Sequence, residues 1–317
     1  MKPLPTMRAA QLTAAPPSAQ NWLIEGLWSA EAVGIIGGEP KTFKSFLALD
    51  LAVAVASGTP CLRHFPTSQH GPVLLFAAED DVHVVRARLE GIAAAAGVAF
   101  ENLDIHIITV PALRLDRHDD RMALAATVAL LLPKLLVLDP FVRLHCIDEN
   151  VAAEVAPLLG YLRTLQRSHH TAVALVHHAR KGAAHERGGQ ALRGSSEFHA
   201  WGDSNLYMRR VGRQLQLSIE HRAAAGRDWF PLALQDHPPA LALEMMDQQP
   251  ASAPLAQPSC QQRIEQVLAA AGEPLTQKAV RDMVRMRTSD VSQALAVLVA
   301  NGRVIKSAGG YLPGPSR

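Results

Sequence analysis

One stretch of the sequence combines the residue types that hold phosphate groups. The apolar run Val33–Ile36 leads into Gly37–Ser45 (GGEPKTFKS), and the apolar segment FLALDLAVAVAS follows. A strand, a Gly-containing loop, Lys-Ser and a helix is the order of a P-loop, whose backbone N–H groups and helix N-terminus hold phosphates. Lys44 would reach the β- and γ-phosphates, and the Ser45 hydroxyl would coordinate Mg²⁺. The predicted nucleotide-binding residues are Gly38, Glu39, Pro40, Lys41, Thr42, Phe43, Lys44 and Ser45.

This loop departs from the usual pattern at one position. The pattern G-x-x-x-x-G-K-[ST] has a second glycine where this chain has Phe43. A phenylalanine is strained at any positive φ and crowds the approach to the phosphates. Two alternatives therefore stay open: an ordinary strand–turn–helix with a capping serine, and a scaffold that binds nucleotide without hydrolysing it.

Two further apolar runs end in acidic residues. Leu135–Leu138 is followed by Asp139, whose carboxylate suits the Mg²⁺ shell, and Val73–Ala78 is followed by Glu79, which could deprotonate the attacking water. Ligands of open α/β sheets bind at the carboxyl ends of the strands, so the three segments predict one site for ATP and Mg²⁺. The simpler alternatives are a capping aspartate before Pro140 and helix N-terminal charge at Glu79.

The segments around these residues alternate short apolar runs with longer amphipathic ones. Continuous Leu/Ile/Val runs predict parallel strands covered on both faces, and hence an α/β fold with a mostly parallel sheet. The runs Asn205–Met208 and Leu215–Glu220 are expected to add antiparallel strands. Strands are predicted at 33–36, 73–77, 105–109, 135–138 and 172–176, and helices at 45–57, 81–97, 119–131 and 151–168.

Together these segments resemble RecA-type ATPases of the plasmid RepA hexameric helicase group, near the DnaB replicative helicases. The resemblance rests on GGEPKTFKS, LLFAAEDD, LLVLDP, LVHHARK and RGSSEFHAWGDSNLYMRR, and spans roughly residues 22–246. AAED is the most discriminating part, because it places Glu79 where RecA-type enzymes carry the catalytic glutamate. The resemblance implies a RecA-like P-loop NTPase fold, a homo-oligomer with a hexamer favoured, and DNA as partner.

The same resemblance implies three further roles. His177 or His178 would sense the γ-phosphate, although a strand-capping histidine is an equal alternative. Arg222 would reach a neighbouring subunit's ATP, although Glu220 stands where the family has lysine and an exposed hairpin arginine is the alternative. The Gly-rich basic segment 179–196 would contact single-stranded DNA, or would be a solvated loop. Its candidate DNA-binding residues are Lys181, Arg187 and Arg193.

The end of the chain forms a separate predicted module. Residues 1–20 are expected to be a flexible arm, 21–246 the ATPase domain, 247–261 a Pro/Ser/Gln/Ala-rich linker and 262–317 a winged helix-turn-helix. This module would bind DNA, and the alternative is a winged helix that contacts protein. The DNA-binding residues predicted here are Arg285, Arg287, Ser292, Arg303 and Lys306.

Composition supports this division and excludes other classes of protein. The chain has 317 residues, of which 48% are hydrophobic, and a formal net charge of +2. Residues 259–317 carry eight Lys or Arg and four Asp or Glu, so the small module is basic while the rest is slightly acidic. No run of 18 apolar residues or signal-peptide pattern predicts membrane insertion or secretion, and three scattered cysteines fit a reduced cytoplasm.

These observations predict a DNA-dependent ATPase. Its most direct interpretation is an oligomeric, replicative helicase-like DNA motor of plasmid or phage type. The alternative is a DNA-binding regulatory or recombination-accessory ATPase that does not unwind DNA. In both cases Lys44, Glu79, Arg222 and His177 are the predicted catalytic residues, and Ser45 and Asp139 the Mg²⁺ ligands.

Overall fold

The computed structural model divides the chain into two compact units, Met1–Met246 and Asp247–Arg317, each with its own hydrophobic core. Part of the predicted arm is described and contains one exposed 3-10 turn, η1 (Ala9–Gln11). Residues 247–259 of the predicted linker lie outside the described residues. The structure describes residues 3–11, 21–179, 196–237, 240–246, 260–284, 288–307 and 309–314.

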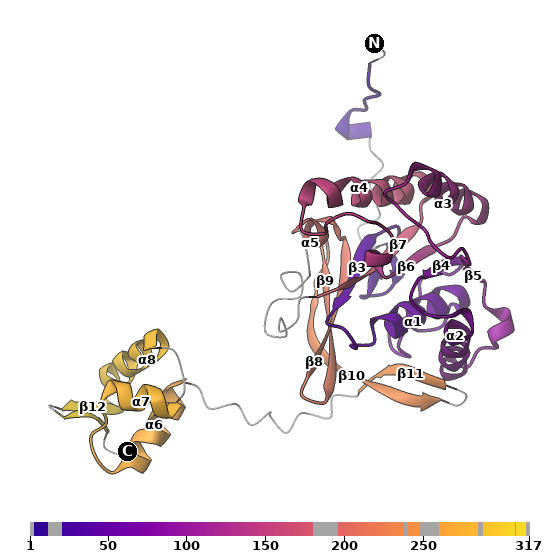
Figure 1. Cartoon of the computed structure of the whole chain (residues 1–317). Coiled ribbons are helices and arrows are strands. Elements are labelled where there is room, and N and C mark those ends of the chain that lie inside the picture. Colours follow the sequence, from indigo (N-terminus) through magenta and orange to yellow (C-terminus); the bar gives the residue numbers. More distant parts are fainter. Residues whose placement is uncertain are drawn as a thin grey trace. The chain divides into compact units, whose positions relative to one another are not determined.

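A nine-stranded sheet forms the centre of the first unit (Figure 1). Its strands are β3 (Val33–Gly38), β4 (Val73–Ala77), β5 (Ile105–Ile107), β6 (Leu135–Asp139), β7 (Ala172–His178), β8 (Ser204–Val211), β9 (Gln214–His221), β10 (Arg227–His237) and β11 (Ala240–Met245). Their order is β11-β10-β9-β8-β3-β7-β6-β4-β5. The strands from β8 to β5 are parallel, so the carboxyl ends of β3, β6 and β4 lie on one edge.

Helices cover both faces of the parallel part (Figure 1). The helices α1 (Lys44–Ser57) and α2 (Val82–Ala96) pack on one face, and α3 (His118–Leu131) and α4 (Ala152–His169) on the other. Along β6, Leu135 and Val137 face the first pair while Leu136 and Leu138 face the second. Both faces are therefore buried, as continuous aliphatic runs predict. No helix in the described part is long and apolar enough to cross a membrane.

Most predicted elements are confirmed, but the expectation for the β8 region was wrong. We expected antiparallel additions after residue 193, whereas β8 runs parallel to β3 and only β9, β10 and β11 are antiparallel. The connection from β7 to β8 returns through the short helix α5 (Glu197–Trp201), which lets β8 start beside the start of β3. A parallel neighbour requires such a crossover, because a tight hairpin reverses the strand.

Small elements complete the first unit. The hairpin β1 (Trp22–Ile24) and β2 (Trp28–Ser29) precedes the sheet, and Trp28 is fully buried. The Ser29 N–H donates to the Ser204 hydroxyl at 3.1 Å, so this hairpin is attached to the first residue of β8. Two 3-10 turns, η2 (Phe100–Asn102) and η3 (Phe141–Arg143), lie between the larger elements.

The second unit contains three helices and a two-stranded ribbon. They are α6 (Cys260–Ala271), α7 (Gln277–Val284), α8 (Thr288–Ala300), and the antiparallel pair β12 (Val304–Ser307) and β13 (Gly310–Pro313). The Thr276 hydroxyl accepts the Ala279 N–H at 3.2 Å, which caps the N-terminus of α7. Ile264, Leu268 and Leu295 lie in its core.

Candidate active site

The predicted phosphate loop connects β3 to α1. A Cβ on Gly38 would lie 2.3 Å from the Met208 carbonyl oxygen, so neighbouring β8 leaves room for glycine alone at the end of β3. The Thr42 hydroxyl and the Lys44 ammonium both donate to the Glu39 carbonyl oxygen at 2.8 Å. These two bonds fold the loop over the N-terminus of α1, which is the end of a helix that favours anions.

The strain predicted at Phe43 is present. Phe43 has a φ of 63° and Lys41 a φ of 64°, both in the left-handed region. A φ in this region raises the free energy of a non-glycine residue by roughly 1 kcal/mol. The Phe43 ring packs edge-on against Phe46 with centroids 5.9 Å apart, and the Arg210 guanidinium lies 5.4 Å from its centroid. These contacts offset the strain and keep the loop bent without the usual second glycine.

Lys44 is held as a poorly solvated cation. Its residue is only 5% exposed. Burial lowers the pKa of its ammonium to about 8, against the opposing effect of the nearby carboxylates of Asp139, Glu79 and Glu39. A cation that has lost hydration in this way gains most from an anionic ligand. Phosphate oxygens supply that charge.

Ser45 and Asp139 meet at the carboxyl edge of the sheet. Burial raises the pKa of Asp139 to about 6, and the hydrogen bond from Ser45 opposes this rise. Asp80 and Glu79 raise the pKa further, whereas Lys44 lowers it. Magnesium takes oxygen ligands, commonly one or two from protein and the rest from phosphate and water. A hydroxyl and a carboxylate beside a phosphate loop therefore fit Mg²⁺.

Two acidic residues follow β4, and each is paired with an arginine. The Arg143 Nε lies 2.9 Å from the Glu79 carboxylate, and Arg88 contacts both carboxylate oxygens of Asp80, one of them at 3.1 Å. The Glu79 side chain is 43% exposed, so water reaches its carboxylate. Glu79 is thus positioned by one arginine and open to solvent on the cavity side.

A cavity of about 670 Å³ brings these groups together. Of the residues predicted from the sequence, Lys41, Phe43, Lys44, Ser45, Glu79 and Asp139 line it. Phe46, Arg88 and Arg210 also line it and were missed. Arg210 ends the segment RGSSEFHAWGDSNLYMRR, but no role was predicted for it from the sequence, because it reaches the loop only through the pairing of β8 with β3. The volume suits a nucleotide-sized ligand.

The sequence also matches a known family. The family model AAA_25, described as an AAA domain, matches residues 2–184, which is more than half of the chain. The chain belongs to this AAA-domain family. With its P-loop, acidic strand ends and mostly parallel sheet, it is a RecA-like P-loop ATPase.

A solved structure shares this fold, and a second one is similar to part of the chain. The RadB recombinase has a TM-score of 0.50 at 16% sequence identity, with 69% of this chain and 92% of that chain covered. A KaiC-like protein of the hyperthermophilic archaeon Pyrococcus horikoshii has a TM-score of 0.49 at 15% identity, with 70% and 93% covered. At these identities the likeness concerns the fold alone.

The two histidines that end β7 lie on opposite faces of the sheet. His178 lines the nucleotide cavity. His177 is 1% exposed and stacks on Phe198 with ring centroids 4.1 Å apart, while Phe141 meets it edge-on. The structure therefore brings His178, rather than the predicted catalytic His177, to the cavity. His177 instead connects η3, which follows Asp139, with α5.

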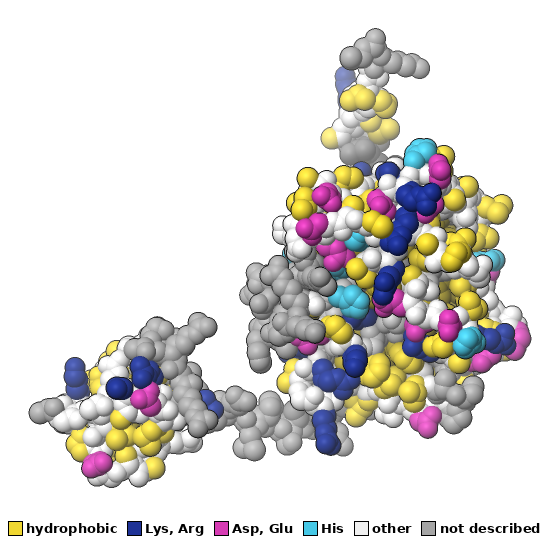
Figure 2. Space-filling model, viewed as in Figure 1, with side chains coloured by type: hydrophobic (Ala, Val, Ile, Leu, Met, Phe, Trp, Pro, Cys, Tyr) yellow, Lys and Arg dark blue, Asp and Glu magenta, His cyan; other side chains and the backbone are white. Residues whose placement is uncertain are grey.

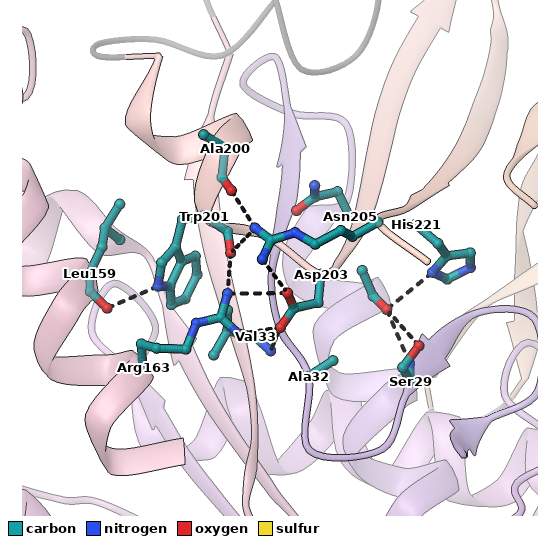
Figure 3. A network of polar contacts seen from close by, with 12 residues as sticks. Ser29, Ala32, Val33, Leu159, Arg163, Ala200, Trp201, Asp203, Asn205 and His221 are labelled. Atoms are coloured by element: carbon teal, nitrogen blue, oxygen red, sulfur yellow. Dashed lines mark hydrogen bonds and ion pairs between the residues drawn. The ribbon is translucent and has the colours of Figure 1, made fainter. Parts of the chain in front are cut away.

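Arg222 lies at the other edge of the sheet, where it pairs with Asp203, a residue of the polar network drawn in Figure 3. Its Nη1 lies 3.1 Å from the Asp203 carboxylate, which also pairs with Arg163. The Asp203 N–H donates to the Val33 carbonyl oxygen at 2.7 Å. Val33 starts β3, whereas the phosphate loop follows its end at Gly38. The structure thus places Arg222 away from the nucleotide cavity of its own chain.

The predicted DNA-binding residues are only partly described. Lys181, Arg187 and Arg193 in the Gly-rich segment, and Arg285 and Arg287 before α8, lie outside the described residues.

Three others are described in the second unit. Ser292 is exposed and its hydroxyl lies 2.5 Å from the Gln277 amide nitrogen. Arg303 pairs with Glu265 at 2.7 Å, and Lys306 is exposed on β12.

Figure 2 shows Lys and Arg side chains interspersed with Asp and Glu on the visible face of the first unit. That face carries no continuous basic surface in the described part.

Proposed function

We propose that this ATPase is DNA-dependent and works as an oligomeric, helicase-like DNA motor of plasmid or phage type. The observation that carries the ATPase part is the convergence of Lys44, Ser45, Asp139 and Glu79 on one cavity of about 670 Å³. The DNA-dependent part rests on the basic second unit and on the basic segment that follows β7.

Hydrolysis follows from the positions of these groups. Lys44 and the N–H groups at the start of α1 hold the β- and γ-phosphates. The free oxygen of the Glu79 carboxylate accepts a proton from water as the water oxygen bonds to the γ-phosphorus and the bond to the bridging oxygen breaks. Arg143 orients this carboxylate. Ser45 and Asp139 would hold Mg²⁺, which neutralises phosphate charge when bound.

Assembly would complete the site. One chain keeps Arg222 at the edge of the sheet opposite its own cavity, so an arginine finger at this position has to serve a neighbouring chain. Asp203 would have to release Arg222 in that assembly, while Arg163 remains to pair with the Asp203 carboxylate. This supports a homo-oligomer, and a hexameric ring is the form that we propose.

DNA contact is proposed for two places. The order of three helices and an antiparallel ribbon suits a winged helix-turn-helix, with Ser292 facing bases and Lys306 and Arg303 near phosphates. The segment 179–196 begins at the end of β7, directly beside His178 of the nucleotide cavity. DNA bound at the start of this segment, next to Ala179, would be close to the hydrolysed phosphate, which is what coupling requires.

Turnover by the full chain, with and without single-stranded DNA, tests this proposal. We expect DNA to stimulate the wild type, and Glu79→Gln to retain MgATP binding while turnover falls about 100-fold, since the amide cannot accept the proton. Glu90→Gln on the surface of α2 is the matched control and should behave like the wild type. Turnover by Glu79→Gln at the wild-type rate would refute the role of Glu79.

A second candidate is a regulatory or recombination-accessory ATPase that binds DNA without unwinding it. The observation that favours it is the shared fold with the RadB recombinase. Strand displacement on a forked duplex separates the two functions. A motor releases the displaced strand in an ATP-dependent manner, whereas an accessory ATPase hydrolyses ATP and leaves the duplex intact.

A further inference from the structure

We propose that Arg210 binds the phosphate groups of the nucleotide that is held by its own protein chain. We also propose that the Phe43 ring positions the Arg210 guanidinium through a cation–π contact. This inference rests on the proposed nucleotide site and adds a cation that the P-loop pattern does not contain. It also gives Phe43 a role in place of the expected glycine.

The strand pairing brings Arg210 to the loop. Met208 of β8 lies opposite Gly38, the last residue of β3, and Arg210 follows two residues later on the same face of β8. Met208 packs in the core that includes α1, so this face is the one on which the phosphate loop turns into α1. Arg210 therefore reaches over the loop and lines the cavity together with Lys44.

Arg210 keeps its charge available, in contrast to its neighbours. Arg88 is paired with Asp80, and Arg143 with Glu79. Within the described residues, the structure shows no ion pair for Arg210; its guanidinium lies 5.4 Å from the centroid of the Phe43 ring. An aromatic face attracts a cation without neutralising it. A guanidinium presented in this way is suited to two hydrogen bonds with phosphate oxygens.

Phe43 positions Arg210 at the cost of backbone strain. Its φ of 63° is one that glycine adopts freely, so glycine would relieve the strain but remove the ring. The ring is itself fixed edge-on against Phe46, the second residue after Lys44. The arrangement predicts that the consensus residue would weaken this particular site rather than improve it.

Equilibrium binding of MgATP and of inorganic tripolyphosphate to the full chain tests the proposal. We expect Arg210→Ala to weaken both ligands about tenfold, because the lost contact is to phosphate. Arg210→Lys should recover part of the loss. Phe43→Gly should weaken both ligands, and the double variant should be little weaker than Arg210→Ala alone, since the two residues act together. Arg213→Ala, at the exposed turn after β8, is the control and should bind like the wild type.

Each other outcome has a defined meaning. Wild-type binding of tripolyphosphate by Arg210→Ala overturns the phosphate contact, whether or not ATP binding falls. If the two substitutions reduce the binding affinity additively in the double variant, Phe43 does not position Arg210. A wild-type chain that binds neither ligand overturns the proposed nucleotide site itself. Circular dichroism confirms folding, and Arg210→Gln replaces the alanine variant if that variant does not fold.

Discussion

The two edges of the central sheet treat their charged residues in opposite ways. At the edge where β3 begins, Asp203 pairs with both Arg163 and Arg222, so the charges there satisfy one another. At the edge where β3 ends, burial has moved the pKa of Lys44 to about 8 and that of Asp139 to about 6, each toward its neutral form. Incompletely satisfied buried charge is typical of a ligand site, whereas charges that are paired with one another within the chain are typical of a structural network.

Removing the buried cation should have the largest effect. Lys44→Ala should lower ATP turnover about 1,000-fold, because no other group occupies its place between the phosphates. It should leave the melting temperature of the nucleotide-free chain unchanged or higher, since a desolvated charge is removed. Steady-state turnover and thermal unfolding measure both. A large loss of stability would show that Lys44 is structural, and the two edges of the sheet would then not differ in this respect.

The second largest effect concerns Asp139 and pH. Its pKa in the folded chain, about 6, lies above the ordinary value of 3.8, so the folded state binds more protons between these values. The stability of the nucleotide-free chain should therefore fall as pH rises from about 4 to about 6, by about 3 kcal/mol from this group. Urea unfolding across this range measures the fall.

A matched pair of variants isolates this contribution. Asp139→Asn should remove most of the fall and stabilise the nucleotide-free chain at neutral pH. Asp236→Asn, an exposed acid on β10, should keep the wild-type pH profile. An unchanged pH profile of stability in Asp139→Asn would show that the titration of Asp139 does not cause the fall.

At the opposite edge, Asp203→Ala should destabilise the chain by about 2 kcal/mol. This substitution removes the carboxylate that pairs with Arg163, and it also removes the acceptor of the hydrogen bond from the Val33 N–H. Arg222→Ala should cost less than about 1 kcal/mol, because that side chain is 52% exposed. Thermal unfolding compares the two. Equal losses would mean that Arg222 is as important to the network as Asp203.

The smallest effect is expected at Arg143. Its ion pair with Glu79 is solvent-exposed, with side chains 61% and 43% exposed, so Arg143→Ala should barely change stability. Turnover should fall several-fold at an unchanged KM, because only the orientation of the general base is lost. Arg143→Lys should recover part of the rate. A raised KM with unchanged turnover would place Arg143 in nucleotide binding instead.

Local patterns made the fold and much of the cavity predictable. The apolar runs that became β3, β4, β6 and β7 are buried on both faces, so each carried a strong signal. Lys44, Glu79 and Asp139 were found because each directly follows such a run or its loop. The helices were predicted to within a few residues because they lie in the longer amphipathic segments between these runs.

Contacts between distant residues were not predictable in this way. The parallel placement of β8 depends on a crossover and not on the composition of the strand. Arg210 and Arg88 reach the cavity only after β8 and α2 are placed. The choice between His177 and His178 depends on which face of β7 each residue occupies, and a strand alternates its faces without revealing which one carries the ligand.

Hydrogen–deuterium exchange of the full chain, with and without MgATP, tests whether the nucleotide binds at the edge of the sheet where β3 ends. We expect MgATP to slow exchange in peptides that cover 37–46, 77–80 and 139–143, where the cavity lies. Protection there should disappear in Lys44→Ala. Unchanged exchange in these three segments at saturating MgATP would contradict the placement of the nucleotide at this edge of the sheet.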